Sequence, residues 1–114
     1  GPSHPDHLAV GEATTCAVYP DARNPFAFPE LMDEGLQPWV VREVWYAGGP
    51  NPDHVVDVTD TFDVKLAALK CHVTQTSHIE DLEGMLRSRM AEVARNAGLP
   101  EGRLAEAFTI IRTE

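Results

Sequence analysis

A histidine-rich tetrapeptide near the start of the chain is the segment best suited to chemistry. Residues 4–7 read His-Pro-Asp-His and place two imidazoles and a carboxylate within four positions. Imidazole nitrogens are common zinc ligands, and a nearby carboxylate can fix the tautomer of a histidine. In a helical turn His4 and His7 converge on one face. The tetrapeptide therefore predicts a metal or acid–base site, with a solvated terminal segment as the alternative.

One tetrapeptide cannot complete a catalytic zinc site, because such sites use three protein ligands and keep one position open. The remaining candidate groups have structural interpretations. His54 lies in an expected turn, and Asp57 lies between valines. His72 lies near the end of an expected helix, where the helix dipole favours a positive charge. None of these residues adds a clear metal ligand to the tetrapeptide.

Composition narrows the classes of function. The 114 residues hold 18 acidic and 9 basic side chains, for a net charge of −9. Nucleic-acid binding and attachment to anionic membranes both depend on basic surfaces, so we expect neither partner. The sequence has no apolar run of about 18 residues and no signal-peptide pattern, so we expect a cytoplasmic protein. The two cysteines, Cys16 and Cys71, predict reduced and buried thiols.

The first third of the chain predicts one helix and one long loop. Apolar residues at helical spacing predict a helix over 7–19 that is capped by Asp6 and ended by Pro20. Residues 20–38 are rich in proline and predict a loop with apolar anchors. Loops of this length often form walls or lids of functional sites. Arg23 and Asn24 in this loop are therefore candidate substrate-binding residues.

The rest of the chain alternates strands and helices. Residues 40–47 and 55–58 predict strands, and residues 107–111 predict a last short strand. A helix after Thr59 or Asp60 carries an apolar stripe, made of Phe62, Leu66, Leu69 and Val73. Ser77 and Glu80 form a capping-box pattern for a further helix that ends at Gly98.

Residues 4–11, His-Pro-Asp-His-Leu-Ala-Val-Gly, resemble the second motif of the LmbE-like, or PIG-L, zinc-dependent de-N-acetylases. Further segments are similar to later parts of the same family and follow in the same order. These segments are residues 17–26, residues 55–60 with 65–72, and residues 105–108. The resemblance therefore covers nearly the whole chain.

The resemblance implies a role for each residue of the tetrapeptide. In the family, one zinc ion is held by a histidine and an aspartate from an early H-P-D-D motif and by a histidine from the H-P-D-H motif. By this similarity His7 is the zinc ligand. His4 stabilises the oxyanion of the tetrahedral intermediate, and Asp6 orients and charges His4. Zinc polarises the acetyl carbonyl and lowers the pKa of its bound water in such enzymes.

The sequence departs from the family in one respect, because the early H-P-D-D motif is absent. The resemblance then implies that residues 1–114 are a single partial domain, the C-terminal portion of a LmbE-like deacetylase. We expect α/β architecture, namely the C-terminal part of a Rossmann-like, mostly parallel sheet with covering helices. An open sheet edge predicts a homo-oligomer or a need for the missing N-terminal half.

The leading functional hypothesis is a zinc-dependent hydrolase that removes an N-acetyl group from an amino-sugar conjugate or related small amide. The chain alone is expected to be inactive, because only one of the three zinc ligands remains. A non-catalytic binding or structural module that retains part of the fold is the alternative. A phosphohydrolase with a His-Asp pair is disfavoured, because that dipeptide does not occur in the chain.

Overall fold

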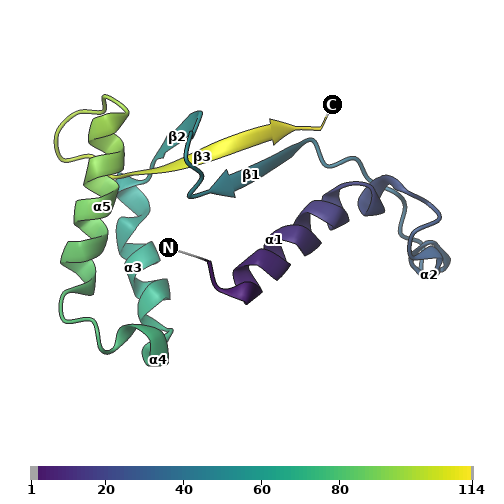
Figure 1. Ribbon diagram of the computed structural model, residues 1–114, viewed down its shortest axis with the longest axis horizontal. Helices are drawn as coiled ribbons and strands as arrows, with labels where there is room; N and C mark the ends of the chain where they lie inside the picture. The colour runs from purple at the N-terminus through teal and green to yellow at the C-terminus, as the bar shows by residue number, and fades with distance from the viewer. Residues whose placement is uncertain (1–2, 114) are drawn as a thin grey trace. The chain divides into compact units, whose positions relative to one another are not determined.

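The computed structural model describes residues 3–113 and divides the chain into two compact units. Unit 1 comprises residues 1–45 and 111–114, and unit 2 comprises residues 46–110. Figure 1 shows the course of the chain. In order, the elements are α1 (Pro5–Val18), α2 (Pro29–Asp33), β1 (Glu43–Ala47), β2 (His54–Asp57), α3 (Phe62–Lys70), α4 (Val73–Thr76), α5 (Leu82–Asn96) and β3 (Ala105–Arg112), with short 3₁₀ turns at Asp21–Arg23 and Thr59–Thr61.

The three strands form a small antiparallel sheet in the order β1-β3-β2 (Figure 1). β3 is central, and His54 of β2 lies opposite Phe108 in an antiparallel register. The expected C-terminal part of a Rossmann-like, mostly parallel sheet is therefore wrong. The reason is that β3, the last strand of the chain, lies between the two earlier strands and pairs with them in the antiparallel direction, so β1 and β2 are not neighbours.

The hydrophobic core described in this structure lies in unit 2. It joins α3, α5 and the start of β3, and its buried residues are Phe62, Leu66, Leu82, Met90 and Leu104. The predicted apolar stripe is confirmed at Phe62 and Leu66. It fails at Val73, which is 62% exposed, because α3 ends at Lys70 and Val73 begins the separate helix α4.

The two ends of α5 test the expected helix signals. The Ser77–Glu80 capping box is wrong, since Ser77 instead ends α4. The cap is Asp81, whose Oδ1 accepts a hydrogen bond of 2.9 Å from the backbone N–H of Gly84. The expected stop at Gly98 is confirmed. Gly98 has φ +78°, and the N–H of Leu99 donates to the carbonyl of Ala94 at 2.9 Å, which is the pattern of a Schellman motif.

Unit 1 is built around α1 and the loop that follows it. α1 ends as predicted, because Tyr19 is extended before Pro20. Its N-cap is His4 rather than the expected Asp6. None of the described residues of unit 1 is buried. The expected burial of Cys16 is therefore wrong, and Cys71 of unit 2 is also exposed; both are free thiols. A domain over residues 1–114 remains a prediction.

Candidate functional site

The start of α1 brings the three predicted site residues of the tetrapeptide together. His4 Nδ1 accepts a hydrogen bond of 3.1 Å from the backbone N–H of Asp6. The same nitrogen lies 3.7 Å from Asp6 Oδ2, and the rings of His4 and His7 are 6.1 Å apart. The side chains of His4 and Asp6 are 66% and 86% exposed. The tetrapeptide thus presents two imidazoles and a carboxylate to solvent at one helix end.

The helix itself explains why His4 takes this position. The first backbone N–H groups of a helix have no partner inside it, and His4 supplies one through Nδ1. With Nδ1 acting as acceptor, the proton of a neutral imidazole is on Nε2. His4 therefore presents an Nε2–H donor that the cap does not use. The helix dipole adds positive potential at this same end.

The metal-binding capacity of this cluster is limited. Within residues 3–113, no group of three or more His, Cys, Asp or Glu side chains is arranged to hold a metal ion. His7 offers one imidazole, which is one of the three protein ligands that a catalytic zinc site uses. The described residues therefore do not form a complete zinc centre, and additional ligands are needed before a metal can be held tightly.

Arg23 and Asn24, the predicted substrate-binding residues, follow the opposite end of α1. The 14 residues of α1 span about 21 Å, so the helix separates them from His4. The Arg23 guanidinium lies 5.0 Å from the ring centre of Tyr19, and its Nη2 donates to Thr113 Oγ1 at 3.2 Å. Its buried Nε has no hydrogen-bond partner among the described residues. Arg23 thus packs within unit 1 and does not join the tetrapeptide.

Asn24 lines a groove formed in part by the loop that is expected from the sequence to be a wall or lid. Asn24 Oδ1 accepts a hydrogen bond of 3.0 Å from the backbone N–H of Phe26, which shapes the loop. The groove has a volume of about 510 Å³ and is bounded by α1, α2 and the loop between them. Small residues on one face of α1 and apolar loop residues line it. The sequence predicts the apolar loop residues as packing anchors and does not predict the hollow itself.

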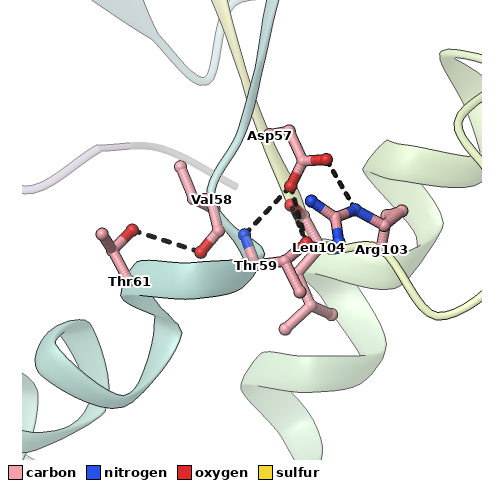
Figure 2. Close-up of polar contacts among 6 residues, drawn as sticks. All are labelled: Asp57, Val58, Thr59, Thr61, Arg103 and Leu104. Carbon is pink, nitrogen blue, oxygen red and sulfur yellow. Dashed lines mark hydrogen bonds and ion pairs between the residues drawn. The ribbon is translucent and has the colours of Figure 1, made fainter.

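A second polar cluster lies in unit 2, at the junction between the end of β2 and the start of β3 (Figure 2). Arg103 Nε donates to Asp57 Oδ2 at 2.7 Å. Thr59 donates to Asp57 Oδ1 from its backbone N–H at 3.1 Å and from its hydroxyl at 2.6 Å. The same hydroxyl accepts from the N–H of Leu104 at 2.9 Å. These bonds link the turn after β2 to the residue that precedes β3.

These hydrogen bonds favour the ionised form of the Asp57 carboxyl and lower its pKa. The Arg103 hydrogen bond, followed by those of Thr59, lowers the pKa of Asp57 from 3.8 to about 2. The Asp57 carboxylate also raises the pKa of Arg103. The hydrogen bonds that Asp57 accepts come from Thr59 and Arg103, which hold the turn after β2 against the residues before β3. The structural interpretation of Asp57 therefore agrees with its contacts.

The other two histidines singled out in the sequence lie at the ends of elements. His54 is the first residue of β2 rather than a turn residue. His72 precedes α4 as its N-cap, and its carbonyl accepts from Thr76 Oγ1 at 2.9 Å. His72 also follows the end of α3, as expected, and its N–H donates to the carbonyl of Leu69 at 3.1 Å, so it lies between the two helices.

Comparison with known proteins gives no family assignment. The sequence matches no protein-family model and no curated protein. Among residues 3–113, none of the helices is both long and apolar enough to cross a membrane.

Proposed function

We propose that this chain contributes one metal ligand and an oxyanion-stabilising histidine with its orienting carboxylate to a cytoplasmic, zinc-dependent amide hydrolase. The reaction is removal of an N-acetyl group from an amino-sugar conjugate or a related small amide. Support for this reaction class comes from the resemblance of residues 4–11 to the LmbE-like de-N-acetylases. The observation that carries the proposal is the exposed cluster of His4, Asp6 and His7 at the start of α1.

In this proposal His4 stabilises the oxyanion that develops on the acetyl carbonyl. Its Nε2–H is not used by the helix cap, so it is available to a substrate. A preorganised donor aimed at a developing oxyanion contributes about 3–4 kcal/mol in characterised enzymes. The Asp6 carboxylate, 3.7 Å from Nδ1, is proposed to orient the His4 ring. Both contributions come from side chains of this chain, whereas the zinc site is incomplete within residues 3–113.

His7 is proposed as the ligand that this chain adds to the zinc centre. The remaining ligands must come from polypeptide outside the described residues, since residues 3–113 hold no three-donor group. Two ligands and the general base are expected in an H-P-D-D motif. If the gene has coding sequence upstream of residue 1, that sequence is the first place to search for this motif.

The test is to express the chain together with that preceding coding sequence, then to measure bound zinc and acetate release from N-acetylated amino sugars. We expect one zinc per chain and acetate release. His7→Ala should lose bound zinc, whereas His4→Gln should keep zinc and release acetate more slowly. His78→Ala is the matched control, because His78 is an exposed histidine outside the tetrapeptide, and it should change neither quantity.

The 114-residue chain alone should neither retain one equivalent of zinc nor release acetate. Stoichiometric zinc and turnover by this chain alone would contradict the assigned roles. An extended chain that lacks the H-P-D-D motif and binds no zinc would favour the alternative, a non-catalytic binding or structural module.

A further inference from the structure

One glycine of α1 has no structural reason within the part of the chain that the structure describes. Four of the described glycines have positive φ, a conformation that L side chains rarely adopt, namely Gly35, Gly48, Gly98 and Gly102. Added side chains at Gly49 and Gly84 would meet neighbouring side chains. Gly11 differs from all of these, because its φ lies outside the positive range and a Cβ there would have no atom within 4 Å.

Gly11 also weakens the helix that contains it. It lies in the interior of α1, and glycine disfavours a helix relative to alanine because it loses more backbone freedom on folding. Neither the backbone conformation nor the packing among residues 3–113 requires a glycine at this position. The space above Gly11 is therefore open to a group outside the described residues.

The open space lies beside the proposed zinc ligand. His7 precedes Gly11 by four residues, and helical residues at this spacing are surface neighbours with Cβ atoms roughly 5–6 Å apart. Helical side chains point back toward the N-terminus, so a larger side chain at position 11 would extend over the turn that holds His7. The absence of a side chain therefore leaves the exposed His7 imidazole accessible from this direction.

The surface that Gly11 presents is apolar. Its carbonyl accepts a hydrogen bond of 2.8 Å from Thr15 Oγ1 besides its bond within the helix, so both of its lone pairs are used. A ligand above Gly11 would therefore contact its Cα rather than a free polar group. Val10, the other surface neighbour of His7, is also apolar and is 64% exposed. The space next to His7 thus suits an alkyl group better than a hydroxyl or a charge.

We propose that Gly11 is a specificity-determining residue of the hydrolase site, where it makes room for the acyl end of the substrate beside His7. This inference rests on the proposed function. The substrate of that reaction carries an N-acetyl group, whose methyl is apolar and lies one bond from the carbonyl carbon. The bare Cα of Gly11 then sets the largest acyl group that the site accepts.

Access to His7 can be measured on the 114-residue chain itself. Diethyl pyrocarbonate acylates exposed imidazoles, and tandem mass spectrometry locates the modification at His7, with the exposed His78 as the internal standard. Gly11→Leu should slow the reaction of His7 by at least about threefold, because the leucine lies over the imidazole. Ala9→Leu is the matched control, since Ala9 is an exposed residue of α1 that does not face His7, and it should leave the rate unchanged. Equal rates in the two variants would overturn the proposal.

Acyl selectivity is measured in the extended chain with N-acetylglucosamine and N-propionylglucosamine. Gly11→Ala should lower the ratio of kcat/KM for the propionyl substrate to that for the acetyl substrate by at least about tenfold, because the added methyl group takes the space of one methylene. Ala9→Leu should leave this ratio unchanged. Circular dichroism checks that the variants retain α1, as expected because alanine and leucine form helices better than glycine does. A fall in both kcat/KM values by the same factor would indicate a general disturbance of the site and would overturn the proposal.

The same measurements separate failure of this inference from failure of the proposed function. An extended wild-type chain that releases no acetate would contradict the proposed function and this inference with it. An active wild-type chain together with an unchanged acyl ratio in Gly11→Ala would contradict this inference alone. Loss of bound zinc in Gly11→Ala would place polypeptide rather than substrate above Gly11, and it would also overturn the inference.

Discussion

Replacing Phe62 by alanine should remove a large part of the stability of unit 2. Phe62 is 2% exposed, begins α3 and belongs to the core cluster with Leu66 and Met90. The Arg87 guanidinium lies 4.2 Å from the centre of its ring, so the ring also makes a cation–π contact. Truncation of a buried phenylalanine to alanine costs about 3–5 kcal/mol, because it loses burial and leaves a cavity.

That cost is large for a unit of this size. Unit 2 spans residues 46–110, and folded proteins have roughly 0.05–0.15 kcal/mol of stability per residue, which gives a total of about 3–10 kcal/mol. Phe62→Ala should therefore remove between about a third and all of that stability. Phe62→Leu keeps most of the apolar volume and should cost about 1–1.5 kcal/mol. With a urea slope near 1 kcal/mol/M, its midpoint should fall by about 1–1.5 M.

Urea titration followed by the amide NMR signals of Gly84 and Gly98 measures unit 2 alone. Val64→Ala is the matched control, since Val64 is on the same helix and is 70% exposed. This control should shift stability by less than about 0.5 kcal/mol. If the free energy of unfolding of Phe62→Ala lies within about 1 kcal/mol of the wild-type value, the packing of α3 against α5 described above is incorrect.

Three further substitutions test the polar contacts and helix ends. The hydrogen bonds of Asp57 lower its pKa from 3.8 to about 2, so their stabilisation is complete above pH 4 and is lost as the pH falls toward 2. Asp57→Asn should therefore show a smaller decline in urea midpoint between pH 4 and pH 2, and a decline equal to that of the wild type would contradict this role. Asp81→Ala should lower the stability of unit 2 by about 0.5–2 kcal/mol through loss of the α5 cap, measured by urea titration. Glu80→Ala is its control and should have little effect. A larger loss of stability in Glu80→Ala than in Asp81→Ala would instead support the capping box inferred from sequence. Gly98→Ala should cost roughly 1 kcal/mol by the same measurement, because φ at this position is +78°, and a stabilised variant would contradict the left-handed helix end.

Local signals in the sequence predict the elements better than their assembly. Proline at position 20 and glycine at position 98 end helices through their own backbone geometry, so both ends could be predicted. Phe62 and Leu66 are spaced to face a core. The start of α5 was misplaced because Ser77–Glu80 matches a capping pattern. The correct signal was Asp81, which directly precedes the apolar Leu82.

The sheet and the groove depended on information that local patterns do not contain. Alternation of strands and helices is compatible with parallel and antiparallel pairing, and only long-range contacts decide between them. For the candidate site, sequence spacing predicts that His4, Asp6 and His7 lie together. The groove could not be derived in the same way, because apolar residues around Phe28 have the same composition whether they fill a core or border a hollow.

The position of β3 at the centre of the sheet has a consequence for synthesis on the ribosome. β1 and β2 have no strand partner until residues 105–112 are available, and the Arg112–Glu43 ion pair spans 69 positions in sequence. During translation the two earlier strands therefore emerge with unpaired backbone groups, and β1 also carries the partly exposed Trp45 and Tyr46. Nascent chains that stall before residue 105 should be prone to aggregation through these edges and should depend on chaperones until β3 emerges.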